Sequence, residues 1–112
     1  MSEIVRFNSK TAVFQQGATT KLEVANAQKT FAADVTIPDV ANYVVIRVEA
    51  SASTTASVCA RFYTTGGSPS SVNGNPIANL DVLVFTKDQF TNLSFISVDT
   101  NTQILWFQWF QV

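Results

Sequence analysis

The 112-residue chain is 46% hydrophobic and 13% charged, which suits one folded domain and argues against a largely disordered chain. Seven basic and eight acidic residues give a net charge of −1 without a basic cluster, so the composition predicts no binding to nucleic acid. Histidine is absent, which removes the most common general base and metal ligand and excludes a Ser-His or Cys-His dyad.

The first part of the chain contains short apolar pieces separated by polar residues. The pieces at 4–7, 12–15 and 22–25 are predicted to be edge strands or parts of an extended arm. Residues 1–16 are the candidate arm, with an ordinary first strand as the alternative. An arm of this kind adds a strand to the exposed sheet edge of a neighbouring chain, and the residues expected to make that contact are Ile4, Val5 and Phe7.

The clearest alternation of apolar and polar residues in the chain runs over 31–37. Phe31, Ala33, Val35 and Ile37 share one parity, and the pattern stops at Pro38. Alternation with a period of two is typical of a strand with one buried face. The sequence therefore predicts a strand over 31–37.

Two further alternating stretches, 43–50 and 56–63, are joined by a connection of small residues. The sequence predicts that these two strands pair as a hairpin. In that arrangement Arg47 or Glu49 would face Arg61 across the ladder.

The segment 64–78 contains three of the four glycines and two of the three prolines, and it is the longest predicted loop. Long loops without secondary structure are often functional. We expect a neutral polar surface that contacts another protein, with a mobile connection as the alternative. The residues expected on this surface are Ser68, Pro69, Ser70, Ser71, Asn73 and Asn75.

The last third of the chain predicts three more strands. Strands over 80–85 and 90–98 flank a turn or single helical turn at 86–89, and a tight turn at 99–102 precedes a strand over 103–112 that is apolar on both faces. About eight short strands at 8- to 14-residue spacing, with abundant valine and threonine, indicate an all-β fold. We predict one domain, 1–112, folded as a two-sheet antiparallel sandwich that is jelly-roll-like, with immunoglobulin-like topology left open.

The polar residues offer little chemistry. The eight carboxylates are dispersed; a glycosidase-type pair such as Glu49 and Asp81 is conceivable, but solvated strand faces and turns explain them better. The single Cys59 has no disulfide partner and is predicted to be a packed, inert thiol in a reducing compartment. Neither a signal sequence nor a long apolar run is visible, which predicts a cytoplasmic site of synthesis and no membrane contact. We predict no enzyme, no metal and no cofactor.

Four aromatic residues lie within the nine residues 104–112, more than a small sandwich easily buries. Three interpretations of Trp106 and Trp109 remain open: core residues, an interface between subunits, or a platform on which a sugar ring stacks.

The stretch 93–107 consists of an apolar strand, the turn Asp99-Thr100-Asn101-Thr102, and an apolar-aromatic strand. In this closing hairpin, and in its neutral composition and length, the chain resembles the small capsid decoration, or cement, proteins of tailed bacteriophages. The resemblance implies a jelly-roll-like domain that binds the outside of an assembled capsid as a dimer or trimer and bridges neighbouring major capsid subunits. It brings no catalytic residues, and it implies synthesis in the host bacterial cytoplasm and a location on the virion surface.

The alternative function is that of a carbohydrate-binding module or lectin-like domain of a phage particle. Glycan would then stack on exposed aromatic side chains. The candidates are Trp106, Trp109, Tyr43 and Tyr63.

Overall fold

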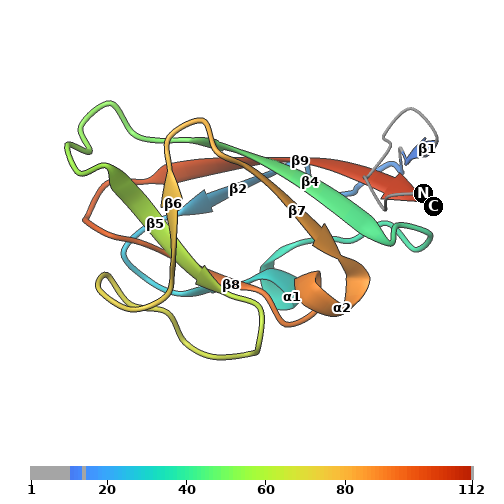
Figure 1. Ribbon diagram of the computed structural model, residues 1–112. Helices are drawn as coiled ribbons and strands as arrows, with labels where there is room; N and C mark the ends of the chain where they lie inside the picture. Colours follow the sequence, from blue (N-terminus) through green and yellow to red (C-terminus); the bar gives the residue numbers. More distant parts are fainter. Residues whose placement is uncertain (1–10, 14, 112) are drawn as a thin grey trace, which may run out of the picture.

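The computed structural model describes residues 11–13 and 15–111, with no side-chain description of Thr11. These residues form nine strands and two short helices, and the strands make two antiparallel sheets packed face to face (Figure 1). The predicted all-β sandwich is confirmed. The candidate contact residues Ile4, Val5 and Phe7, and most of the predicted arm, lie outside the described residues.

The first sheet, here called sheet A, is built around its longest strand. This strand, β9, pairs with β4 on one side and with both β1 and β2 on the other, while β7 pairs with the far edge of β4. The bounds are β1 Thr11–Val13, β2 Lys21–Val24, β4 Tyr43–Glu49, β7 Val82–Thr86 and β9 Gln103–Gln111.

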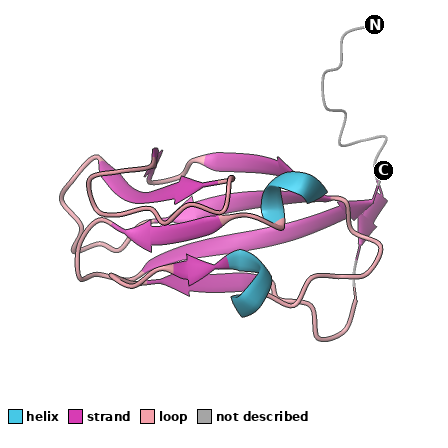
Figure 2. Ribbon diagram, turned by 90° about the horizontal axis from the view of Figure 1, so that it is seen from below, coloured by secondary structure: helices cyan, strands magenta, loops and turns pink. Residues whose placement is uncertain are grey.

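The second sheet, sheet B, contains four described strands in the order β3-β8-β5-β6. Two one-turn helices, α1 and α2, lie close together at one end of the sandwich (Figure 2). The bounds are β3 Lys29–Thr30, β5 Val58–Tyr63, β6 Asn75–Ala78, β8 Ser94–Ser97, α1 Phe31–Asp34 and α2 Lys87–Phe90.

The strand pairing is that of a jelly roll. Four antiparallel ladders are nested in the sequence, β5 with β6, β4 with β7, β3 with β8 and β2 with β9. Two further ladders, β4 with β9 and β5 with β8, join these pairs into the two sheets. Such a long hairpin wrapped into two sheets gives the orders β2-β9-β4-β7 and β3-β8-β5-β6, with β1 as an addition at the end of β9.

The space between the sheets is filled by an aromatic cluster centred on Phe31. Its ring centroid lies 5.1 Å from that of Phe107, 5.9 Å from that of Trp109 and 6.1 Å from that of Phe90. Tilted and edge-to-face pairs of this kind contribute about 0.5 to 1.5 kcal/mol each beyond their buried area. The one cysteine, Cys59, is also buried here, as predicted.

The predicted strand over 31–37 is wrong. Residues 31–34 form helix α1, in which the N–H of Val35 donates to the carbonyl of Phe31 and a carboxylate oxygen of Asp34 accepts from the N–H of Thr30. Phe31 and Val35 are both buried, while Ala33 is exposed. Residues four apart, such as Phe31 and Val35, lie on the same face both in a helical turn and in a strand. The alternation alone therefore did not distinguish a helix from a strand.

The two predicted hairpins are also wrong. β4 and β5 lie in different sheets, so Arg47 and Glu49 do not face Arg61. Likewise β8 and β9, the strands of the supposed closing hairpin, belong to sheets B and A. Local alternation identifies strands, but a connection that crosses between sheets has the same small and polar residues as a hairpin turn.

Several predicted bounds shift at the end of the chain. Phe90 ends helix α2, so strand β8 covers only Ser94–Ser97 of the predicted strand, and β6 occupies the last residues of the predicted long loop. The last strand is not buried on both faces: burial alternates along most of β9, with Leu105 and Phe107 buried and Trp106 and Gln108 exposed.

Candidate functional site

The two tryptophans of β9 have different environments. Trp109 is 2% exposed, packs in the aromatic cluster, and donates its indole N–H to the carbonyl of Thr19 at 2.8 Å. It is therefore a core residue, and its proposed roles at an interface or sugar platform are wrong. Trp106 is 42% exposed on the opposite face of the same strand, the outer face of sheet A.

The strand register places six side chains of this outer face in two adjacent rows across β2, β9 and β4. Lys21 and Arg47 lie opposite Trp106 on its two sides, and Glu23 and Glu49 lie opposite Ile104 in the same way. We call Lys21, Trp106 and Arg47 the basic row, and Glu23, Ile104 and Glu49 the acidic row. Each row has an apolar centre between two like charges.

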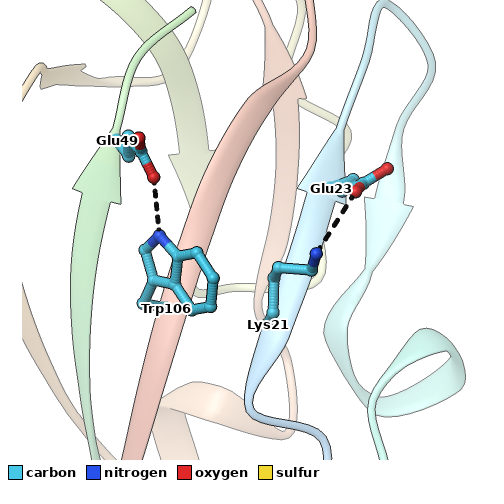
Figure 3. A network of polar contacts seen from close by, with 4 residues as sticks. All are labelled: Lys21, Glu23, Glu49 and Trp106. Carbon is cyan, nitrogen blue, oxygen red and sulfur yellow. Dashed lines mark hydrogen bonds and ion pairs between the residues drawn. The ribbon is translucent and has the colours of Figure 1, made fainter.

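Contacts within the basic row and between the two rows fix the indole of Trp106. Its N–H donates to Oε1 of Glu49 at 2.9 Å, and the ammonium of Lys21 lies 5.5 Å from the ring centroid (Figure 3). Lys21 also forms an ion pair with Glu23 at 3.6 Å. Because these partners hold both the plane and the edge of the ring, Trp106 is presented to solvent in one orientation.

A shallow depression of about 420 Å³ lies beside Trp106. Arg47 borders it, and the Arg47 guanidinium forms no ion pair or side-chain hydrogen bond with the described part of the chain. Two exposed valines of β7, Val82 and Val84, continue the apolar surface. An aromatic ring and an unpaired arginine on an apolar surface have the composition of binding hot spots between proteins. The residues lining the depression are Val45, Arg47, Val82, Trp106, Phe107 and Gln108.

The second exposed feature is the segment 64–74, which connects β5 to β6. Arg61 of β5 holds it in place by donating to the carbonyls of Ser71 at 3.2 Å and Gly74 at 2.9 Å. Gly74 has a φ of +129°, and a β-carbon there would approach the Arg61 side chain to 3.0 Å, so glycine permits this close packing. Because Arg61 holds residues 64–74 in this way, we call them the clamped loop.

The predicted contact residues of this loop do not all lie on its surface. Ser68, Asn73 and Asn75 are exposed, whereas Pro69 is buried and is not available to a partner. Asn75 begins strand β6 and donates to the carbonyl of Phe62. The most exposed large apolar side chain described is Val72, at 74%. Sequence reasoning missed it because a single valine among serines and glycines carries no periodic signal.

The two acids of the conceivable glycosidase-type pair, Glu49 and Asp81, make separate hydrogen bonds. Glu49 accepts from Trp106, and a carboxylate oxygen of Asp81 accepts from the N–H of Ala78 at 2.8 Å. In the ranges 11–13 and 15–111, no three Asp, Glu, His or Cys side chains gather as metal ligands would. The thiol of Cys59 donates to the carbonyl of Ile77 at 3.4 Å, and burial raises its pKa, which keeps it in the unreactive protonated form.

The sequence also did not predict a polar cluster at one end of the sandwich. Gln103 is fully buried; its amide nitrogen donates to the hydroxyls of Thr54 and Ser97, and its Oε1 accepts from the N–H of Ser51 at 2.7 Å. Ser97 in turn contacts Asp99. The polar groups of this cluster hydrogen-bond to one another, so we assign the cluster a role in stabilising the fold.

Comparisons of the chain with protein-family models, curated proteins and solved structures found no match. Within the described part of the chain, no helix has the length and hydrophobicity that crossing a membrane requires.

Proposed function

We propose that this chain is a structural protein of a phage particle, which binds the outer surface of the assembled capsid and stabilises it by bridging neighbouring major capsid subunits. Three observations support the proposal. The chain resembles capsid decoration proteins in composition and length, its fold is a jelly roll of the kind found in viral capsid and lectin domains, and its described surface exposes Val72 and Trp106, side chains suited to contacts with a partner.

The clamped loop is the surface that we assign to the capsid, and the observation that carries this assignment is exposed Val72 on a loop fixed by Arg61. A loop that is already ordered loses little conformational entropy when it binds. Val72 would enter an apolar pocket on the capsid surface, and Ser68 and Asn73 would make polar contacts around it.

Cosedimentation with capsids that lack this protein, taken from the phage that encodes it, tests the proposal. The chain should cosediment with them and raise their resistance to heat. Val72→Asp should weaken binding about tenfold or more, because it places a charge at an apolar contact. Val40→Asp is the matched control, since Val40 is 52% exposed outside the clamped loop. Absence of binding by the unmodified chain would remove the proposed function; equal binding by both variants would remove the loop from the contact.

Carbohydrate binding is the second candidate, and the observation that favours it is the fixed, half-exposed indole of Trp106 beside a depression. A glycan array tests it directly. A sugar ligand should bind the unmodified chain and the Val40→Ala variant but not Trp106→Ala. An array on which no glycan is bound above background would exclude this candidate.

A further inference from the structure

We propose that the outer face of sheet A is the interface of a homodimer, in which a two-fold axis runs across the strands between the acidic row and the basic row. The occupant of this face is a second copy of the same chain. This inference goes beyond capsid binding, and it holds or fails independently of it.

The argument begins with the order of charges on the two rows. Across β2, β9 and β4 the basic row reads positive, apolar, positive, and the acidic row reads negative, apolar, negative. Neighbouring side chains on one face of a strand are about 6.8 Å apart, so the two rows lie side by side along the strands.

A two-fold axis parallel to the sheet and perpendicular to its strands exchanges the two rows. It leaves each strand opposite its own equivalent in the other copy and reverses the strand direction. Arg47 then lies opposite Glu49 of the second copy, Lys21 opposite Glu23, and Trp106 opposite Ile104. Every charge meets its opposite and the two apolar centres meet each other, which is the self-complementarity that a two-fold interface requires.

The properties of the individual residues agree with this arrangement. Arg47 has no ion partner within its own described chain, and the contact with Glu49 of the second copy supplies one. Trp106 and Arg47 are of the residue types that most often dominate binding energy at interfaces. Val82, 55% exposed, lies beside Arg47 in the register and widens the apolar centre. Sheets pack face to face about 10 Å apart with strands nearly aligned, which suits this symmetry.

The dimer is also compatible with attachment to one surface. Rotation about an axis across the strands keeps the same sheet edges on the same side in both copies. The edge strands β6 and β7 therefore lie on one side of the dimer, together with the two clamped loops that lead into β6. Two loops on one side would give bivalent binding.

Charge reversal tests the symmetry as well as the face. Arg47→Glu should place two acidic side chains opposite each other at both equivalent contacts, and Glu49→Arg should place two arginines there. Each single variant should therefore dimerise about 100-fold more weakly than the unmodified chain, or more weakly still. An equimolar mixture of the two variants should form a heterodimer, because every contact again joins opposite charges. The double variant R47E/E49R should dimerise by itself for the same reason.

Sedimentation velocity on the full chain measures these masses, against a protomer of 12.2 kDa. Lys87→Glu is the control, since it makes the same charge change on an exposed residue of α2. It should leave the dimer intact. The mixture guards against misfolding, because a variant that failed to fold would not be restored by its partner. A monomeric or trimeric unmodified chain, a dimer that persists in both single variants, or a mixture that stays monomeric would each overturn the proposal. Capsid binding by a monomeric chain would leave the proposed function standing.

Discussion

Gln103 shows how much a single buried side chain contributes here. All of its polar atoms are satisfied by Ser51, Thr54 and Ser97, in a position with no exposure to solvent. Gln103→Leu keeps the size of the side chain but leaves the N–H of Ser51 without its partner and removes the amide that donates to the hydroxyls of Thr54 and Ser97. We expect the free energy of unfolding, measured by urea denaturation, to fall by about 2 to 3 kcal/mol.

The matched control for this experiment is Gln108→Leu, which makes the same replacement on an exposed residue of the same strand. Its effect should stay within about 0.5 kcal/mol. An equal loss of stability in the two variants would show that the polar cluster around Gln103 contributes nothing specific.

Asp99 gives the stability of the protein a dependence on acid pH. The backbone N–H of Asn101 donates to its carboxylate at 2.9 Å, and this bond, helped by side-chain bonds from Asn101, Thr54 and Ser97, lowers the pKa of Asp99 below its ordinary value of 3.8. A lowered pKa in the folded state means that the ionised carboxylate stabilises the fold. This contribution is complete above the ordinary pKa and is lost as the pH falls through the folded-state pKa.

We therefore expect Asp99→Asn to be less stable than the unmodified chain at neutral pH, and the difference to shrink as the pH falls below about 4. Urea denaturation of both proteins over the range from neutral to strongly acidic pH measures it. A difference that stays constant over the whole range would mean that the charge of Asp99 does not stabilise the fold.

The limits of sequence reasoning are clearest for the tryptophans. Trp106 and Trp109 lie three residues apart on a strand, so alternation places them on opposite faces. It does not tell which face is the core, because both faces of the strand carry large apolar side chains. The structure decides the matter: Phe31 of α1 and Phe90 of α2 pack against Trp109, and contacts between residues so distant in the sequence have no local signal.

At the scale of elements, the clamped loop depends on Arg61. The guanidinium donates from two different nitrogens to two loop carbonyls, which the single ammonium of lysine does not reproduce. Arg61→Lys should therefore loosen the loop and increase its cleavage by a nonspecific protease several-fold, with a small loss of global stability. Mass spectrometry of the first cleavage products locates the cut.

Arg47→Lys is the control for this experiment, because Arg47 belongs to the other sheet and contacts no part of the loop. It should leave cleavage unchanged. Equal protection of the loop in the Arg61→Lys variant would assign its order to other contacts, such as the bond from the Ser94 hydroxyl to the carbonyl of Gly67 at 2.7 Å.

Elements with a strong local signal were predicted well, but the strands with which they pair were not. The strand at 43–49, the helical turn after Thr86 and the turn at 99–102 were all expected close to their observed places. The pairing of 43–49 was wrong because both of its edges are already occupied, by β7 and β9. Those partners lie more than thirty residues further along the chain, beyond the reach of any periodicity.

At the scale of the whole molecule, the reactivity of the Cys59 thiol measures how often the two sheets of the sandwich separate. Its thiol is 1% exposed in β5 and its pKa is raised by burial, so a thiol reagent reacts with it only after the sheets separate. Labelling of the native protein should be slow, and its rate should follow the global unfolding rate as urea is added. Mass spectrometry of quenched samples measures it, and rapid labelling without denaturant would show that β5 opens by itself.

The sandwich arrangement followed from composition and spacing, which predicted about eight short strands where the described residues form nine; so many short strands leave few other ways to bury one face of each. The function and the binding partners did not follow from composition and spacing. Binding through a loop or a sheet face requires no conserved catalytic spacing, so Val72, Arg47 and the two charged rows became visible only when the strands had been placed in register.

The position of β9 has a consequence for folding of the protein during its synthesis on the ribosome. β9 is the last described strand, yet it is the central partner of β1, β2 and β4. Until it leaves the exit tunnel, β1 and β2 lack their partner strand in sheet A, and β4 can pair with β7 alone. Completion of this sheet must therefore follow the translation of β9, and we expect nascent chains stalled before that point to bind chaperones.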